Sequence, residues 1–183
     1  MSKVVADRTS HVKKIAVVGP ECTGKTELSK YLAETFETCW VAEYARAYLD
    51  NLARPYEQSD LTKIAHAQIR LEDEWLYEAN RVLICDTTLE VIKIWSEFKY
   101  GNCDKEIIDL MQLRNYDLYL LTYIDIPWQE DPQREHPDKR EQLWAIYEKE
   151  FADKSPVVLI KGEKQQRRAT AMNAVKPLLS IQG

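Results

Sequence analysis

The sequence reads Gly19-Pro20-Glu21-Cys22-Thr23-Gly24-Lys25-Thr26 directly after an apolar run, Ile15 to Val18. This octet fits the pattern G-x-x-x-x-G-K-[ST] of a phosphate-binding P-loop. The run before it predicts a buried parallel strand, and apolar residues at helical spacing follow it. A turn between a strand and a helix N-terminus points several backbone N–H groups, and the positive end of the helix dipole, at one anion. The sequence therefore predicts that the whole octet binds a nucleoside triphosphate.

Two residues of the octet carry chemistry that the backbone does not supply. Lys25 is expected to reach the β- and γ-phosphates, and the Thr26 hydroxyl is expected to hold Mg²⁺. Gly19 and Gly24 let the backbone bend and approach the phosphates closely. The octet does not indicate what happens to the γ-phosphate, so the reaction has to be inferred from the rest of the chain.

The composition is that of an ordinary globular protein, with 183 residues of which 45% are hydrophobic and 30% charged. We expect a single domain over residues 13–183, preceded by a flexible extension over residues 1–12. A net charge of −5 argues against a nucleic-acid-binding protein. No apolar run approaches the roughly 18 residues of a membrane span. The four cysteines lack C-x-x-C or metal-ligand spacing, which indicates reduced thiols in a cytoplasmic protein. Neither composition nor charge predicts an oligomeric state.

Strand-like and helix-like segments alternate along the chain. Strands are predicted over residues 13–18, 38–42, 81–86, 117–123 and 156–161, and helical patterns fill most of the intervals. This alternation predicts a P-loop NTPase fold of the α/β class, with three layers (α/β/α) around a mostly parallel five-stranded sheet. The longest helix is predicted from its N-cap, Ser59, to about residue 79. His66 and Gln68 interrupt its apolar pattern, and we assign neither to the site.

Polar side chains follow three of the predicted strands, in the octet, in residues 43–46 and in residues 86–88. The carboxyl ends of parallel strands meet at one edge of a sheet, where ligands bind in open α/β folds. Asp86 ends an apolar strand, as a Walker-B acid does, and is expected to hold Mg²⁺ through water. Glu43 is expected to accept the proton of an attacking hydroxyl. Arg46 either orients the acceptor or pairs with Glu43 at i, i+3 spacing.

A charged, proline-rich segment, residues 125–138, follows the fourth strand and predicts a mobile surface lid. Arg134 in this lid and Arg140 just after it are expected to reach the migrating phosphate when the lid closes. The alternative is that both are solvated surface arginines. Trp128 either covers a flat ring by stacking or anchors the lid to the body of the protein. Arginines in a lid favour a small-molecule kinase over a GTPase, and the sequence has neither N-K-x-D nor a D-x-x-G switch after the third strand.

Taken in order, these motifs resemble the ribosylnicotinamide kinase domain of NadR-type proteins. The resemblance rests on the octet and on E-Y-A-R at 43–46, I-C-D-T at 84–87, P-W-Q-E-D-P-Q-R at 127–134 and the helix from Ser59 to Gln68. It covers about residues 13–175. The resemblance implies a P-loop kinase that uses ATP and Mg²⁺ to phosphorylate the 5′-hydroxyl of nicotinamide riboside. The product, nicotinamide mononucleotide, would serve NAD biosynthesis.

The resemblance also implies roles for single residues. The riboside would be faced by Glu43, Tyr44, Arg46 and Asp86, and the phosphates by Lys25, Thr26, Arg134 and Arg140. We therefore assign catalysis to Lys25, Glu43, Asp86, Arg134 and Arg140. Substrate binding is assigned to Glu43, Tyr44, Arg46, Asp86 and Trp128, and metal binding to Thr26 and Asp86.

The residues leave two other functions open. One is an ATP-binding regulatory module with little turnover, because P-loop folds host switches as readily as kinases. The other is a kinase for a different nucleoside or nucleotide, although the D-R acceptor motif of thymidylate kinases is missing where Asp86-Thr87-Thr88 stands. The sequence decides neither which ring the acceptor carries nor whether Glu43 or Asp86 is the base.

Overall fold

The sheet of this protein has five strands, all parallel, in the order β2-β3-β1-β4-β5. The computed structural model describes residues 11–154 and 156–180, so the expected extension over 1–12 lies almost wholly outside the described residues. The strands are β1 (Lys13–Val18), β2 (Trp40–Val41), β3 (Val82–Asp86), β4 (Leu118–Thr122) and β5 (Val157–Ile160). The predicted parallel sheet is confirmed.

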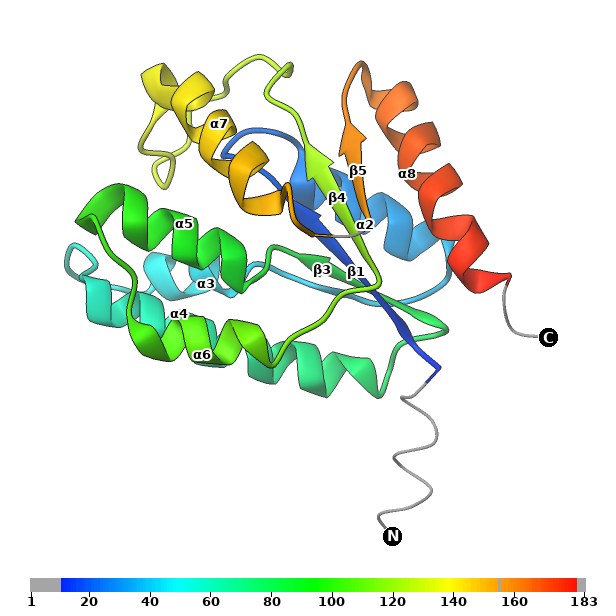
Figure 1. Cartoon of the computed structure of the whole chain (residues 1–183), viewed down its shortest axis with the longest axis horizontal. Coiled ribbons are helices and arrows are strands. Elements are labelled where there is room, and N and C mark those ends of the chain that lie inside the picture. Colours follow the sequence, from blue (N-terminus) through cyan, green and yellow to red (C-terminus); the bar gives the residue numbers. More distant parts are fainter. Residues whose placement is uncertain (1–10, 155, 181–183) are drawn as a thin grey trace, which may run out of the picture.

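Helices cover both faces of this sheet (Figure 1). Helices α2 (Lys25–Thr35) and α8 (Lys164–Leu179) pack on one face. The other face is covered by α5 (Leu89–Tyr100) and α7 (Arg140–Phe151). The remaining helices join α5 in a separate apolar cluster; they are α3 (Tyr44–Asp50), α4 (Gln58–Leu76) and α6 (Lys105–Gln112). The predicted three-layer α/β/α fold is therefore confirmed.

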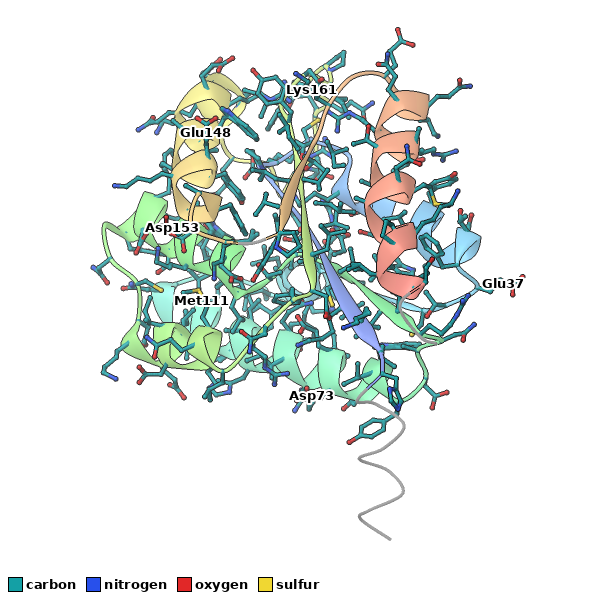
Figure 2. The ribbon with its side chains drawn as sticks, turned by 45° about the vertical axis from the view of Figure 1, so that its right-hand side comes forward. Glu37, Asp73, Met111, Glu148, Asp153 and Lys161 are labelled. Atoms are coloured by element: carbon teal, nitrogen blue, oxygen red, sulfur yellow. The ribbon has the colours of Figure 1, made fainter. Side chains whose placement is uncertain are left out.

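The alternation of side chains along the strands explains why one sheet carries two cores. In β1, Ile15 and Val17 face α2 and α8, whereas Ala16 and Val18 face α5 and α7. All four are fully buried, as expected for a parallel strand covered on both faces. Figure 2 shows side chains filling the space on both sides of the sheet, with Lys161 just after β5 at one end and Asp73 at the other. The carboxyl ends of the strands thus lie together at the Lys161 end.

Helix α4 begins differently from the prediction. The expected N-cap, Ser59, lies inside the helix, and Glu57 takes the N-cap position. The reason is Asp60, whose buried carboxylate accepts the backbone N–H of Glu57 at 2.9 Å and both guanidinium nitrogens of Arg54 at 2.7 and 2.9 Å. This capping box fixes the start of the helix earlier than a serine cap would.

A second carboxyl group on α4, that of Glu72, is 1% exposed and forms no ion pair within the described residues. The Tyr116 hydroxyl donates to Glu72 Oε1 at 2.8 Å. Burial raises the pKa of Glu72 to about 7 from its ordinary 4.5. The folded state therefore binds this proton more tightly than the unfolded chain does. The resulting stabilisation is complete below the unfolded pKa and is lost as pH rises through the folded pKa.

We expect Glu72 to lower the free energy of unfolding by on the order of 3 kcal/mol as the pH rises from about 4.5 to about 7. Glu72→Gln should lack this contribution, and urea denaturation of both proteins across that range measures the difference. The charged and titratable groups facing Glu72 are unchanged in the variant, namely Lys14, Asp73, Cys85, Arg114 and Tyr116. Equal pH dependence in the two proteins would contradict the assignment.

The segment between β4 and α7 has little regular structure. It ends in a short 3-10 helix, η1 (Pro137–Lys139), directly before α7. Figure 1 shows this segment and the turn after β1 at the same end of the sheet. Within the described ranges, no helix combines the length and the apolar character needed to cross a membrane.

Candidate functional site

The P-loop adopts the geometry that its glycines were expected to allow. Gly24 has a left-handed φ of 78° and directly precedes α2. Gly19 approaches β4 so closely that a Cβ would lie 2.3 Å from Thr122 Oγ1 and 2.6 Å from its carbonyl oxygen. The Thr23 hydroxyl donates to the Pro20 carbonyl at 2.8 Å, which closes the loop. The backbone therefore curves around the N-terminus of α2, where an anion is favoured.

The functional side chains of the loop face the same space. Lys25 Nζ donates to the carbonyl oxygens of Gly19 at 3.0 Å and Pro20 at 2.9 Å, so its charge sits over the concave side of the loop. Thr26 is exposed, and its hydroxyl donates to Asp86 Oδ2 at 2.6 Å. Asp86 itself is 1% exposed and lies beneath Thr26. The Thr26 hydroxyl thus links the P-loop to the end of β3, and the assignment of both residues to Mg²⁺ stays a prediction.

The Asp86 carboxylate is incompletely satisfied. Its Oδ1 is buried and has no hydrogen-bond partner within the described residues. Burial and the charge of Glu43 together raise the pKa of Asp86 to about 6 from its ordinary 3.8, although Lys25 opposes them. A free buried oxygen beside a hydroxyl suits Mg²⁺, which prefers oxygen ligands and keeps several waters. Thr26 and Asp86 therefore fit the ion, although no cluster of three or more His, Cys, Asp or Glu side chains forms among residues 11–154 and 156–180.

Glu43 stands at the tip of the neighbouring strand. It occupies the N-cap position of α3 but makes no capping hydrogen bond with its side chain, so the carboxylate is free for other partners. It lines the same cavity as the P-loop. Its charge raises the pKa of Asp86, as expected of a neighbouring carboxylate. The shared role of the two acidic strand ends stays a prediction.

A cavity of about 940 Å³ joins these groups. Residues of the P-loop line it, together with Gly162 to Lys164 at the start of α8. Glu43 and Arg46 also line it, with apolar and aromatic residues of α5 and α7, namely Val91, Ile94, Trp95, Phe98, Leu143 and Tyr147. The Trp95 ring is fixed because its Nε1 donates to the Tyr56 hydroxyl at 2.6 Å. The cavity lining thus combines a phosphate-binding loop, a carboxylate and aromatic side chains.

The lid lies across the P-loop. Glu21 Oε2 accepts the backbone N–H groups of Glu135 at 3.1 Å and His136 at 3.4 Å. Cys22 Sγ accepts the backbone N–H of Gln129 at 3.2 Å. The two variable positions that follow Pro20 in the motif therefore bind the lid through its backbone, and residues of both the lid and the P-loop line the cavity.

The lid also contacts helices on the acceptor side. Arg46 forms an ion pair with Asp131 at 3.0 Å and its carbonyl oxygen accepts from Gln133 Nε2 at 3.1 Å. Glu135 pairs with Lys99 of α5 at 3.1 Å. The alternative pairing of Arg46 with Glu43 is therefore replaced by a contact to the lid. Arg46 still lines the cavity, so the orienting role remains a prediction.

Three lid-side residues form one group near Cys22. Arg134 Nη1 donates to Cys22 Sγ at 3.4 Å, and Arg140 Nη2 donates to the Cys22 carbonyl oxygen at 3.3 Å. Each guanidinium carbon lies 5.9 Å from the centroid of the Trp128 ring. The arginines thus reach the P-loop. Trp128 lies beside them, a placement that favours anchoring over ring stacking.

Some of the residues assigned to the site line the cavity, and others do not. Those lining it are Pro20 to Thr26, Glu43, Arg46 and Arg134. Gly19, Tyr44, Asp86, Trp128 and Arg140 are not among its lining residues within the described ranges. Asp86 and Arg140 lie directly behind lining residues, whereas Tyr44 packs with the aliphatic residues between α3 and α4. The roles assigned to these residues stay predictions.

Sequence reasoning missed Gln68. Its fully buried side chain contacts the backbone on both sides of Glu43, with Oε1 accepting from Tyr44 N–H at 2.8 Å and Nε2 donating to the Ala42 carbonyl at 3.4 Å. The available signal was a polar residue within the apolar stripe of α4. The other interrupting residue, His66, is exposed and bonds Glu106 at 2.7 Å, as a surface histidine does.

Comparison with known proteins agrees with this geometry. The profile of a family described as an AAA domain matches residues 14–167. Over 129 residues the chain is 30% identical to the trifunctional NAD biosynthesis/regulator protein NadR of Escherichia coli strain K12, an alignment that covers 67% of this chain and 31% of NadR. The chain thus spans about a third of the length of that curated relative. The similarity to NadR expected from the motifs is confirmed.

Solved structures show the same fold. A crystal structure of NadR protein in complex with NR has a TM-score of 0.75 at 21% identity, covering 96% of this chain and 54% of NadR. Another, in complex with NAD and AMP-PNP, has a TM-score of 0.73 at 20% identity, covering 96% and 52%. A deoxyadenosine kinase from M. mycoides has a TM-score of 0.61 at 15% identity, covering 90% and 99%. These likenesses establish a kinase-type P-loop fold.

Proposed function

This chain belongs to the AAA domain family, and from that premise we propose that it is an ATP-dependent kinase that phosphorylates the 5′-hydroxyl of nicotinamide riboside. The product is nicotinamide mononucleotide, an intermediate of NAD biosynthesis. Similarity to NadR supports the substrate, and the fold shared with a nucleoside kinase supports the reaction class. The four cysteines are free thiols, which supports a cytoplasmic location.

One observation carries this proposal: a phosphate-binding loop and a carboxylate line the same cavity. Lys25 and the P-loop line it, and so does Glu43. Phosphoryl transfer requires a donor and an acceptor held in line with little covalent work by the protein. A cavity of about 940 Å³ falls in the upper range of small-molecule sites, as expected if it holds both a nucleotide and a riboside.

Each group has a separate task in the proposed reaction. Lys25 binds the β- and γ-phosphates and offsets the charge that develops on them. Arg134 and Arg140 bring further positive charge from the lid side. Glu43 orients the acceptor hydroxyl and accepts its proton. Mg²⁺ held by Thr26 and Asp86 would neutralise phosphate charge.

The aromatic side chains that line the cavity suit a flat heterocycle. Trp95, Phe98 and Tyr147 line it together with aliphatic side chains of α5 and α7. A nicotinamide ring placed there would contact aromatic faces and edges while its ribose reaches Glu43. We assign ring binding to these residues, so the Trp128 side chain is not needed for stacking.

The test is a reaction of the chain with ATP, Mg²⁺ and a panel of nicotinamide riboside, adenosine, deoxyadenosine, cytidine and thymidine. We expect nicotinamide mononucleotide, detected by mass spectrometry, with kcat/KM at least about tenfold above that for the other nucleosides. Product from another nucleoside alone would keep the kinase and remove this substrate. ATP binding without any product would favour the regulatory module instead.

A further inference from the structure

The backbone around Glu43 has little support from the sheet. Strand β2 comprises only Trp40 and Val41, and its ladder with β3 ends at the pair Val41 and Cys85. Glu43 adopts φ −61° and ψ 107°, and its side chain makes no capping hydrogen bond to α3. Neither strand pairing nor a cap therefore fixes the direction of its carboxylate.

The Gln68 amide supplies the missing support. It accepts the Tyr44 N–H at 2.8 Å and donates to the Ala42 carbonyl at 3.4 Å, so it holds the peptide groups on both sides of Glu43. The Tyr44 N–H is one of the first N–H groups of α3, which have no partner inside the helix. Gln68 is 0% exposed and packed into α4 next to buried Ala65, Ala67 and Leu61, so its position is well defined.

We propose that Gln68 is a positioning residue for phosphoryl transfer and acts only through Glu43. This inference rests on the proposed function. A general base must lie within hydrogen-bond reach of the hydroxyl, and a displacement of about 1 Å can cost about a hundredfold in rate. Gln68 keeps Glu43 within that reach by fixing the two flanking peptide groups to the rigid helix α4.

The test uses Gln68→Met, which keeps the length of the side chain and removes both hydrogen bonds. We expect kcat with nicotinamide riboside to fall by about 10- to 100-fold while KM for ATP changes little. The matched control is Gln58→Met on the same helix, which removes amide bonds to Asn102 at 2.7 and 3.1 Å that lie away from Glu43. We expect the control to keep the wild-type kcat.

A double-mutant cycle separates positioning from general stability. If Gln68 acts through Glu43, the double variant Glu43→Gln/Gln68→Met is no more than about twofold slower than Glu43→Gln alone. The proposal would be overturned if the losses in kcat of the two single variants multiplied in the double variant. It would also be overturned if Gln58→Met lowered kcat as much as Gln68→Met does. Thermal denaturation of each variant verifies folding at the assay temperature.

The experiment also distinguishes a variant that fails to fold from a failure of the proposed function. If Gln68→Met does not fold, Gln68→Glu enters the same cycle, since it keeps the acceptor for Tyr44 N–H. Gln68→Glu is then expected to lower kcat of the wild type by less than Gln68→Met would. In the Glu43→Gln background it is expected to cause no further loss. If the wild-type chain phosphorylates no nucleoside, the proposed function has failed. If Glu43→Gln is as fast as an active wild type, Glu43 is not the base and the role of Gln68 is overturned, while the kinase remains. Failure of the cycle alone, with an active wild type, removes only the role of Gln68.

Discussion

Glu43→Gln is expected to lower kcat for riboside phosphorylation by about 10²- to 10⁴-fold, the usual contribution of a general base. The amide keeps the shape of the side chain and cannot accept the proton. The side chain of Glu43 makes no capping bond to α3, so the substitution removes no helix cap. Affinity for ATP should stay within about twofold, because Glu43 is assigned to the acceptor hydroxyl and not to the phosphates. Steady-state assays with nicotinamide riboside and equilibrium binding of ATP measure the two quantities.

The matched control for this variant is Glu130→Gln, which changes net charge equally at an exposed lid position. We expect it to keep the wild-type kcat. A wild-type rate for Glu43→Gln would remove Glu43 as the base. An equal loss in Glu130→Gln would show that net charge, and not the position of the carboxylate, matters.

Lys25→Ala is expected to lower kcat/KM by roughly 10³-fold, comparable with removing a preorganised donor from a developing oxyanion. Lys25 is the cation whose side chain sits over the concave face of the P-loop, 3.0 Å from the Gly19 carbonyl oxygen. Unlike Glu43→Gln, this variant should also weaken ATP binding, because Lys25 contacts the phosphates before the reaction as well as during it. Titration with ATP and single-turnover assays separate the two effects.

The control is Lys30→Ala, five residues further along α2, where the amine lies 5.3 Å from the Trp40 ring centroid. It should bind and turn over ATP as the wild type does. If Lys25→Ala retained wild-type kcat/KM, the octet would not be the phosphate site, and the kinase proposal would have to be abandoned.

The strands and the P-loop were predictable because their signals are local. Buried apolar runs mark β1, β3 and β4, and the position of the octet between a strand and a helix identifies it as the phosphate-binding loop. Glu43 and Asp86 could be brought together from sequence because both end parallel strands. Topology alone then places them at one edge of the sheet.

The missed features depend on partners far apart in the chain. The Arg46–Asp131 ion pair joins residues 85 positions apart, so nothing near Arg46 indicates it. Gln68 bonds to backbone groups, which carry no side-chain signature, 24 and 26 positions away. Ser59 was misassigned as the N-cap because the buried Asp60 cluster, with Arg54 and Tyr48, is a tertiary feature.

The attachment of the lid to the P-loop makes its opening directly observable. The amide hydrogens of Gln129, Glu135 and His136 are bonded to P-loop side chains, whereas those of Gln133 and Arg134 are bonded within the lid to Asp131. Deuterium uptake at the first set therefore times detachment of the lid, and uptake at the second set times unravelling of the lid itself. The acceptors for the first set are the side chains of Glu21 and Cys22 in the P-loop. The lid therefore cannot move away without breaking its hydrogen bonds to the P-loop, so the two segments separate in one step.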